Sequence, residues 1–169
     1  MQLLADRGFD RLKIDTVASR AQAGKAGIYR RWDNIAVLAG DALQAAQWHP
    51  PPVDTGSVTG DVEVLLASWQ APLTPAERAA AAVLGVGHTN GDVHRGLTAF
   101  VDGYMQTVMT SLEEHAQERG APLAAIRVDL LAAVLRALYL SRLSPSGPAD
   151  LSDEDVVHLG LILGAERCL

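Results

Sequence analysis

Cationic and aromatic side chains gather near the start of the chain, in the stretch from Ile14 to Trp32. Lys25, Arg30 and Arg31 supply positive charge, and Tyr29 adds a phenolic hydroxyl. Ammonium, guanidinium and hydroxyl groups are the donors with which proteins bind the phosphates and base edges of DNA. Whether these groups can reach a DNA groove depends on the elements that carry them.

The spacing of apolar residues predicts two short helices joined by a tight turn. In the first, apolar or small side chains recur three and four residues apart, as on one buried helix face. These side chains are Ile14, Val17, Ala18 and Ala21. Gly24 follows, and we expect it to take the positive φ of a sharp turn. The second helix would turn Ile28 and Trp32 inward and its cationic side outward, which is the plan of a helix-turn-helix unit that reads DNA.

This stretch resembles the N-terminal DNA-binding domain of the tetracycline-repressor (TetR) family over about the first 48 residues. The most specific part is Lys-x-x-Ile-Tyr-Arg-Arg-Trp at residues 25–32, preceded at the right distance by Gly8-Phe9 and Val17-Ala18. The resemblance implies phosphate contacts from the second helix and base contacts beside them. The residues expected at the DNA are Lys13, Thr16, Lys25, Gly27, Tyr29, Arg30 and Arg31.

Four features depart from the family pattern. Lys13 stands where a Ser or Thr usually caps a helix, and Gly27 stands where a Ser or Thr is common. Asn34-Ile35 replaces a usual Ser-Lys pair, which removes a cation that would contact phosphate. Only Met1 to Arg7 precede Gly8, so we expect further residues upstream of Met1 in the natural protein. These differences bear on DNA affinity and not on the fold.

Charge is divided unevenly along the chain, whose net charge is −6. Residues 1–48 hold seven Lys and Arg against five Asp and Glu, whereas the remainder holds seven against fifteen. A positive end on an acidic body is expected where one end of a protein binds phosphate. The single Cys168 cannot form an internal disulfide, and the sequence shows no signal peptide and no long apolar run. We therefore expect a cytoplasmic protein with no membrane contact.

Beyond residue 48 the sequence predicts a second, all-helical domain over residues 57–169. Pro50-Pro51-Pro52 ends the fourth helix of the chain. Thr74-Pro75-Ala76-Glu77 has the cap, the first-turn proline and the glutamate of a helix start. Further helices are expected over residues 58–69, 74–90, 92–119 and 123–143 and from Ser152 onward. The predicted fold is all-α, with an N-terminal helix-turn-helix DNA-binding domain at 1–48 and a C-terminal helical ligand-binding and dimerisation domain.

The last two helices are more apolar than surface helices, which predicts burial against a second copy of the chain. Gly160 and Gly164, four residues apart, would let two helix backbones approach closely. Burial within a single chain is the alternative. The family resemblance implies a homodimer formed through these helices. The expected interface residues are Leu131, Leu135, Leu138, Val157, Gly160, Leu161 and Gly164.

Large and adaptable side chains lie on the helices that line the ligand cavity in the resembled family. They are Trp69, Phe100, Tyr104, Met105, Met109 and Tyr139. A packed core explains each one singly, but together they predict an apolar effector pocket with a few polar groups. Tyr104 is expected to turn inward, with its hydroxyl bonded to a ligand or a water molecule. Effector binding would favour a dimer whose helices no longer match the DNA grooves.

An enzyme is not expected. The five histidines are scattered without helical pairing, so no metal site and no cofactor are expected. Neither a glycine-rich phosphate loop nor a nucleophile elbow occurs. The expected function is a ligand-responsive transcriptional repressor that binds a palindromic operator in double-stranded DNA as a homodimer and is released by a small apolar effector. The alternative is a helical-bundle partner- or ligand-binding protein with impaired DNA binding.

Overall fold

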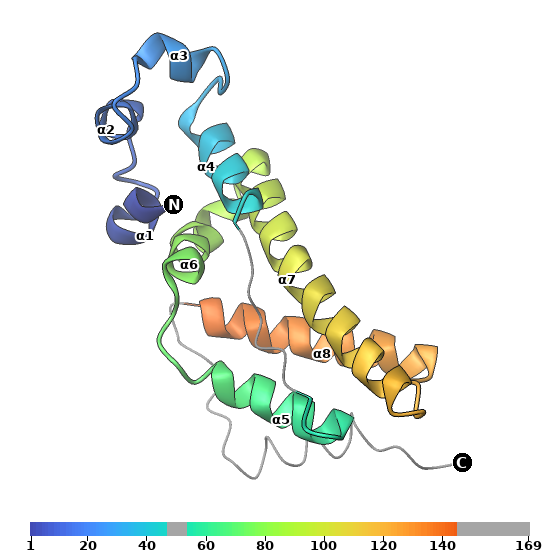
Figure 1. The fold of residues 1–169 in the computed structure, drawn as a ribbon. Helices are drawn as coiled ribbons and strands as arrows, with labels where there is room; N and C mark the ends of the chain where they lie inside the picture. The colour runs from blue at the N-terminus through green and yellow to red at the C-terminus, as the bar shows by residue number, and fades with distance from the viewer. Residues whose placement is uncertain (47–53, 145–169) are drawn as a thin grey trace. The chain divides into compact units, whose positions relative to one another are not determined.

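The structure, a computed structural model, describes residues 1–46 and 54–144, without the side chains of residues 125 and 126. Every regular element in these residues is an α-helix (Figure 1). The helices are α1 (Gln2–Arg7), α2 (Ile14–Arg20), α3 (Lys25–Tyr29), α4 (Ile35–Gln44), α5 (Val58–Ser68), α6 (Pro75–Gly87), α7 (Gly91–Glu118) and α8 (Ala125–Leu143). The predicted all-α fold is confirmed. The helix expected from Ser152 and the interface residues Val157, Gly160, Leu161 and Gly164 lie outside the described residues.

The chain divides into two compact units. One consists of residues 1–47 and 73–102, so α6 and the first part of α7 fold together with α1 to α4. The other consists of residues 48–72 and 103–169, which include α5, the rest of α7 and α8. The two domains predicted from the sequence, a DNA-binding domain at residues 1–48 and an effector-binding domain at residues 57–169, remain a proposal.

Side-chain caps explain where several helices begin. The Thr74 hydroxyl accepts a hydrogen bond from the Glu77 N–H at 3.2 Å, and the Glu77 carboxylate accepts one from the Thr74 N–H at 2.8 Å. This reciprocal pair confirms the predicted start of α6. The Asn34 side chain caps α4 by accepting from the N–H groups of Ala36 and Val37. Lys13, which precedes α2, makes no side-chain cap, as its residue type predicts.

In the first unit, α4 and α7 approach each other through glycines. A Cβ atom built on Gly40 would lie 2.6 Å from the Asp92 carbonyl oxygen, and one on Gly96 would lie 2.3 Å from the Gly40 Cα. Neither position can accept a methyl group without movement of a backbone. Leu43 and Val93 on the same two helices are fully buried, so this close crossing belongs to the core of the unit.

In the second unit, three aromatic rings join α5, α7 and α8. Tyr104 and Tyr139 stack with ring centroids 4.3 Å apart, and the Trp69 ring lies 5.4 Å from that of Tyr139. The buried Arg142 guanidinium donates hydrogen bonds to the carbonyl oxygens of Trp69 and Ala71, at the C-terminal end of α5. A cation is favoured there because the last carbonyls of a helix carry partial negative charge. Arg142 therefore anchors α8 to the end of α5.

Candidate DNA interface

A small apolar core fixes α2 and α3 against each other. Ile14 and Ala18 from α2 and Ile28 from α3 are buried together. Partly buried side chains pack around them, namely Val17, Trp32, Ile35 and Leu38. Because Ile28 and Trp32 point into this core, as predicted, the other sides of α3 are left to the solvent.

The turn between α2 and α3 differs from the prediction in one residue. Gln22, not Gly24, takes the positive φ, at 50°. The Gln22 N–H bonds the Ser19 carbonyl and the Ala23 N–H bonds the Ala18 carbonyl, which is the Schellman arrangement that ends α2. That arrangement requires the left-handed residue directly after the helix cap Ala21. Gly24 instead precedes α3 in an extended conformation, with φ −69°.

The exposed side of α3 carries three of the predicted DNA residues. Lys25 is exposed at the start of the helix, and the Tyr29 side chain is 51% exposed at its end. A Cβ atom on Gly27 would meet nothing within 4 Å, so the space between them is open. The Lys25 ammonium forms an ion pair with the Asp15 carboxylate of α2 at 2.7 Å, and both side chains remain largely exposed. This pair could not be predicted from the sequence, because no periodic spacing relates a residue of α2 to one of α3.

Arg30 and Arg31 lie beyond the end of α3 rather than on it. The helix ends at Tyr29, and the N–H groups of Arg31 and Trp32 both bond the Ile28 carbonyl. The helix is therefore shorter than predicted, although both arginines are exposed. The Arg31 guanidinium lies 5.0 Å over the Trp32 ring, whose N–H donates to the Asp41 carboxylate at 2.8 Å.

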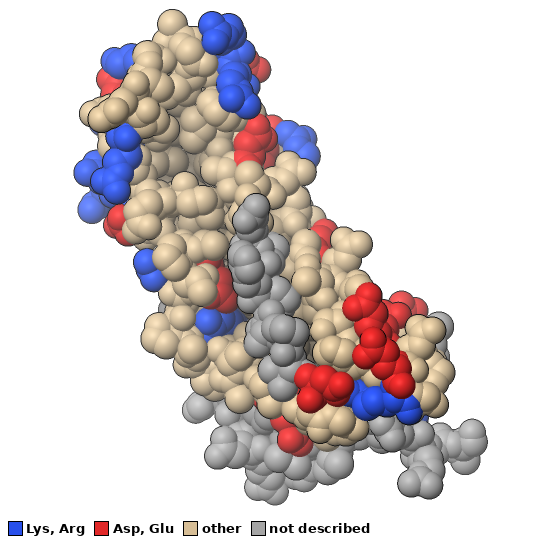
Figure 2. Space-filling view, viewed as in Figure 1, with Lys and Arg blue, Asp and Glu red and all other residues tan. Residues whose placement is uncertain are grey.

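The remaining predicted DNA residues belong to the start of α2. Lys13 is exposed immediately before the helix, and Thr16 is half-buried in its first turn. Figure 2 shows Lys and Arg side chains gathered over α1 to α3. An exposed cationic face on a short, well-anchored helix is an arrangement that can bind DNA phosphates.

The six predicted effector residues are all buried, including Tyr104 at 6% exposure. Five belong to the second unit, and Phe100 belongs to the first. The Tyr104 hydroxyl accepts a hydrogen bond from the Trp69 indole N–H at 2.8 Å. The expectation that this hydroxyl needs a ligand or water as its partner is therefore corrected, because a neighbouring side chain already bonds it.

The predicted interface residues on α8 differ in their exposure. Leu131 and Leu135 are fully buried in the single chain, so packing within the chain already covers them. Leu138 is half-buried. The side of α8 that faces solvent carries Leu130, 55% exposed, with Ala133 and Ala137. The pattern of leucines showed that α8 has a buried face but did not distinguish a partner from the rest of the chain.

None of the described helices is both long enough and apolar enough to cross a membrane.

Comparison with known proteins finds a family similarity at the N-terminus. Residues 1–42 match the model of a family described as bacterial regulatory proteins, tetR family. A DNA-binding transcriptional repressor TetR of Mycobacteroides abscessus is 42% identical over 64 residues, which cover 37% of this chain and 34% of that protein.

Two further relatives are HTH-type transcriptional regulators of uncharacterized function. The one from Bacillus subtilis is 41% identical over 61 residues, covering 36% of this chain and 31% of the relative. The one from Mycobacterium bovis is 38% identical over 63 residues, covering 37% and 31%. The chain thus matches about a third of the length of each of these curated relatives.

Proposed function

We propose that the chain is a tetR-family repressor that binds a palindromic operator as a homodimer and is released by a small apolar effector. The premise is the match of residues 1–42 to that family of bacterial regulatory proteins. This match supports DNA binding and transcriptional regulation. Our proposal goes beyond the family match in four respects, namely the operator, the repression, the dimer and the effector.

One observation carries the proposal for DNA. Lys25 and Tyr29 are exposed on α3, and Arg30 is exposed just beyond its end, while the opposite side of the helix is held by the buried Ile28. The open space at Gly27 lets the backbone of α3 come close to a groove, because no side chain stands in the way. In this arrangement Lys25 and Tyr29 bind phosphates, while Gly27, Arg30 and Arg31 face the bases or the backbone beside them. Lys13 and Thr16 contribute at the start of α2.

The homodimer is supported by the solvent-facing side of α8. Leu130, Ala133 and Ala137 are exposed and follow helical spacing, so they form an apolar strip. Burying such a strip against its counterpart in a second copy removes apolar area from water. Two recognition helices related by a two-fold axis can then enter major grooves about 34–36 Å apart.

The effector pocket is supported by the kind of side chains buried in the second unit. Trp69, Tyr104 and Tyr139 offer aromatic area, and Met105 and Met109 offer side chains that adapt their shape. Phe100, the sixth residue predicted for the pocket, belongs to the first unit and is not part of this argument. A small apolar ligand would enter by displacing part of this packing, which gives it the differential affinity for two conformations that regulation requires.

DNA binding is tested with Lys25→Ala and an inverted-repeat DNA from the promoter of the chain's own gene. Loss of one phosphate contact should weaken binding to all sequences alike and make the slope of log K against log salt shallower by about one unit. Fluorescence anisotropy over a salt series measures both quantities. Arg127→Ala on α8 is the control and should leave the affinity and the slope unchanged.

If wild type fails to retard the inverted-repeat DNA, the alternative of a helical bundle that binds another partner is favoured. If wild type binds but Lys25→Ala and Tyr29→Phe bind equally well, the assignment of α3 as the recognition helix is wrong.

A further inference from the structure

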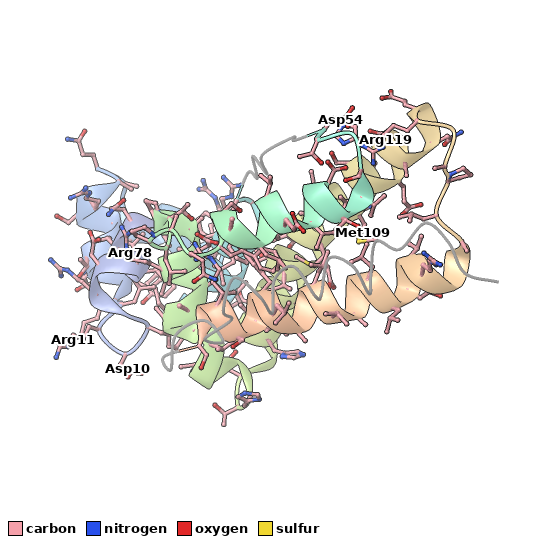
Figure 3. All side chains as sticks on the ribbon, turned by 90° about the horizontal axis from the view of Figure 1, so that it is seen from below. Asp10, Arg11, Asp54, Arg78, Met109 and Arg119 are labelled. Atoms are coloured by element: carbon pink, nitrogen blue, oxygen red, sulfur yellow. The ribbon has the colours of Figure 1, made fainter. Side chains whose placement is uncertain are left out.

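A polar cluster lies where the segment before α5 meets the end of α7, within the second unit. It consists of Asp54, Asp61 on α5, His115 on α7 and Arg119 just beyond α7. In Figure 3 Asp54 and Arg119 lie beside each other at this end of the two helices. The sequence did not predict the cluster, because its members are up to 65 residues apart and follow no helical spacing.

Arg119 holds both carboxylates of the cluster. Its Nη1 donates to Asp54 Oδ1 at 2.5 Å, and its Nη2 donates to Asp61 Oδ2 at 3.0 Å. The other oxygen of Asp61 accepts from the N–H and the hydroxyl of Thr55, at 2.8 and 2.7 Å. The Asp61 side chain is only 2% exposed, so its position is fixed by these bonds. Asp54 is half exposed and free to adjust.

His115 completes the cluster with a nitrogen that lacks a partner. Its Nδ1 atom is buried without a hydrogen bond in the described part of the chain and lies 4.0 Å from Asp61 Oδ2. That separation is too long for a hydrogen bond. A buried nitrogen without a partner is unfavourable by about 1–3 kcal/mol, so the site favours an occupant that accepts its lone pair.

The charges of the cluster favour a cation. Two carboxylates face one guanidinium, so these three side chains together carry an excess of one negative charge. The Gly56 N–H and the Arg119 side chain hold the pKa of Asp54 below its ordinary value, so Asp54 is ionised at neutral pH. Burial disfavours the charged form of Arg119, but hydrogen bonds to Asp61 and Asp54 outweigh it and the pKa of Arg119 is raised. The Arg119 Nε atom is also buried and has no partner in this part of the chain.

We propose that Asp54, Asp61 and His115 form a Zn²⁺ site in which Arg119 holds the carboxylates until the metal displaces it. One ligand atom from each of the three residues lies within 4.8 Å of the others. Bonds of about 2.0–2.2 Å to one ion place the ligand atoms about 3.4 Å apart, which is closer than they lie here. The exposed Asp54 side chain can move to shorten these distances. An imidazole nitrogen with two carboxylates suits Zn²⁺ rather than Mg²⁺ or Ca²⁺, which prefer oxygen ligands alone.

The proposed site differs from the expectation that the chain holds no ligand set for a metal. Histidines at helical spacing are the pattern visible in a sequence, whereas here a single histidine lies near carboxylates from a distant segment. A bound ion would tie the segment before α5 to the end of α7 and would stabilise the second unit by binding only its folded form.

The test is direct Zn²⁺ binding to the full chain in the absence of DNA, by equilibrium dialysis or by competition with a chromophoric chelator. Wild type should bind one Zn²⁺ per chain, with a rise in melting temperature that a chelator reverses. His115→Gln, which keeps a polar side chain of similar size, should weaken binding by at least about tenfold. His94→Gln, at an exposed position on α7, is the control and should bind as wild type does.

The direction in which Arg119→Gln changes the Zn²⁺ affinity is the decisive result. It removes the competitor of the metal, so Zn²⁺ affinity should rise by about tenfold or more, although the metal-free protein loses two ion pairs. Circular dichroism of each variant shows that it remains helical. The site is disproved if wild type binds no Zn²⁺ at 100-fold excess, if His115→Gln binds as wild type does, or if Arg119→Gln weakens binding. These measurements involve no DNA, so their failure leaves the proposed regulator unaffected.

Discussion

Gln22 is the residue other than glycine that holds a left-handed backbone conformation in residues 1–46 and 54–144. The conformation is imposed by the end of α2, where two N–H groups must reach the carbonyls of Ser19 and Ala18. An L-residue with a side chain pays about 1–2 kcal/mol for this backbone region, whereas glycine does not. The turn of the helix-turn-helix unit is therefore strained at Gln22. The Gln22 side chain is exposed, so it contributes no buried contact that would offset this strain.

Gln22→Gly should raise the free energy of unfolding by about 0.5–1 kcal/mol, since the removed strain exceeds the extra chain entropy of glycine. Denaturant unfolding followed by circular dichroism measures the change. Gln106→Gly, at an exposed position inside α7, makes the same replacement in right-handed helix and should destabilise by about 0.5–1 kcal/mol. Equal signs for the two variants would contradict the left-handed assignment.

Tyr104→Phe should lower the stability by about 1–3 kcal/mol, because it removes the acceptor of the buried Trp69 indole N–H. Thermal unfolding without any ligand measures this loss. Tyr29→Phe removes a hydroxyl from a side chain that is 51% exposed and should leave the melting temperature unchanged. A Tyr104→Phe variant as stable as wild type would contradict a stabilising role for the hydrogen bond from Trp69.

The exposed residues of α3 could be predicted from the sequence, whereas the polar cluster around Arg119 could not. Exposure of Lys25 and Tyr29 follows from the inward position of Ile28 and from helical geometry, which is local. The contacts of Arg119 with Asp54 and Asp61 depend on how distant helices pack, and no pattern along the chain encodes them. The same holds for the ion pair of Lys25 with Asp15.

At the scale of helices, capping residues and apolar spacing along the chain predicted the helices of the described residues. The start of α6 was predicted because cap, proline and glutamate all lie within four residues. The range predicted for α7, residues 92–119, differs from the observed Gly91–Glu118 by one residue at each end. The close crossing of α4 and α7 was missed. Gly40 and Gly96 are ordinary interior glycines in the sequence, and only the packed structure shows that each leaves room for the other's backbone.

Gly96→Ala should destabilise the protein by about 1–3 kcal/mol, because its methyl group would overlap the backbone of Gly40 and force the two helices apart. Gly85→Ala on α6 is the matched control. A Cβ atom there meets nothing within 4 Å, so the replacement should stabilise by about 0.5–1 kcal/mol through helix propensity. Thermal unfolding compares the two, and a stabilising Gly96→Ala would contradict the observed crossing.

At the scale of the whole molecule, the proposed homodimer places Leu130 of α8 in the interface. Leu130→Lys should shift the protein from dimer to monomer at micromolar concentration, because a buried charge would face its own copy across the two-fold axis. Sedimentation measures the change, and circular dichroism should show the same helix content. Val64→Lys, at another exposed apolar position on α5, should leave the assembly state unchanged. A wild type that is monomeric at these concentrations would contradict the dimer.

The membership of α6 and of residues 91–102 in the first unit decides how the chain can be dissected. A fragment that stops at residue 47 would lack α6, against which α1 packs, and would lack the Gly96 surface that receives Gly40. Such a fragment would carry every proposed DNA contact and still expose core leucines to water. A chimera that exchanges the DNA-binding domain between relatives should therefore transfer residues 73–102 together with residues 1–47. The junction between the two parent sequences then belongs inside α7.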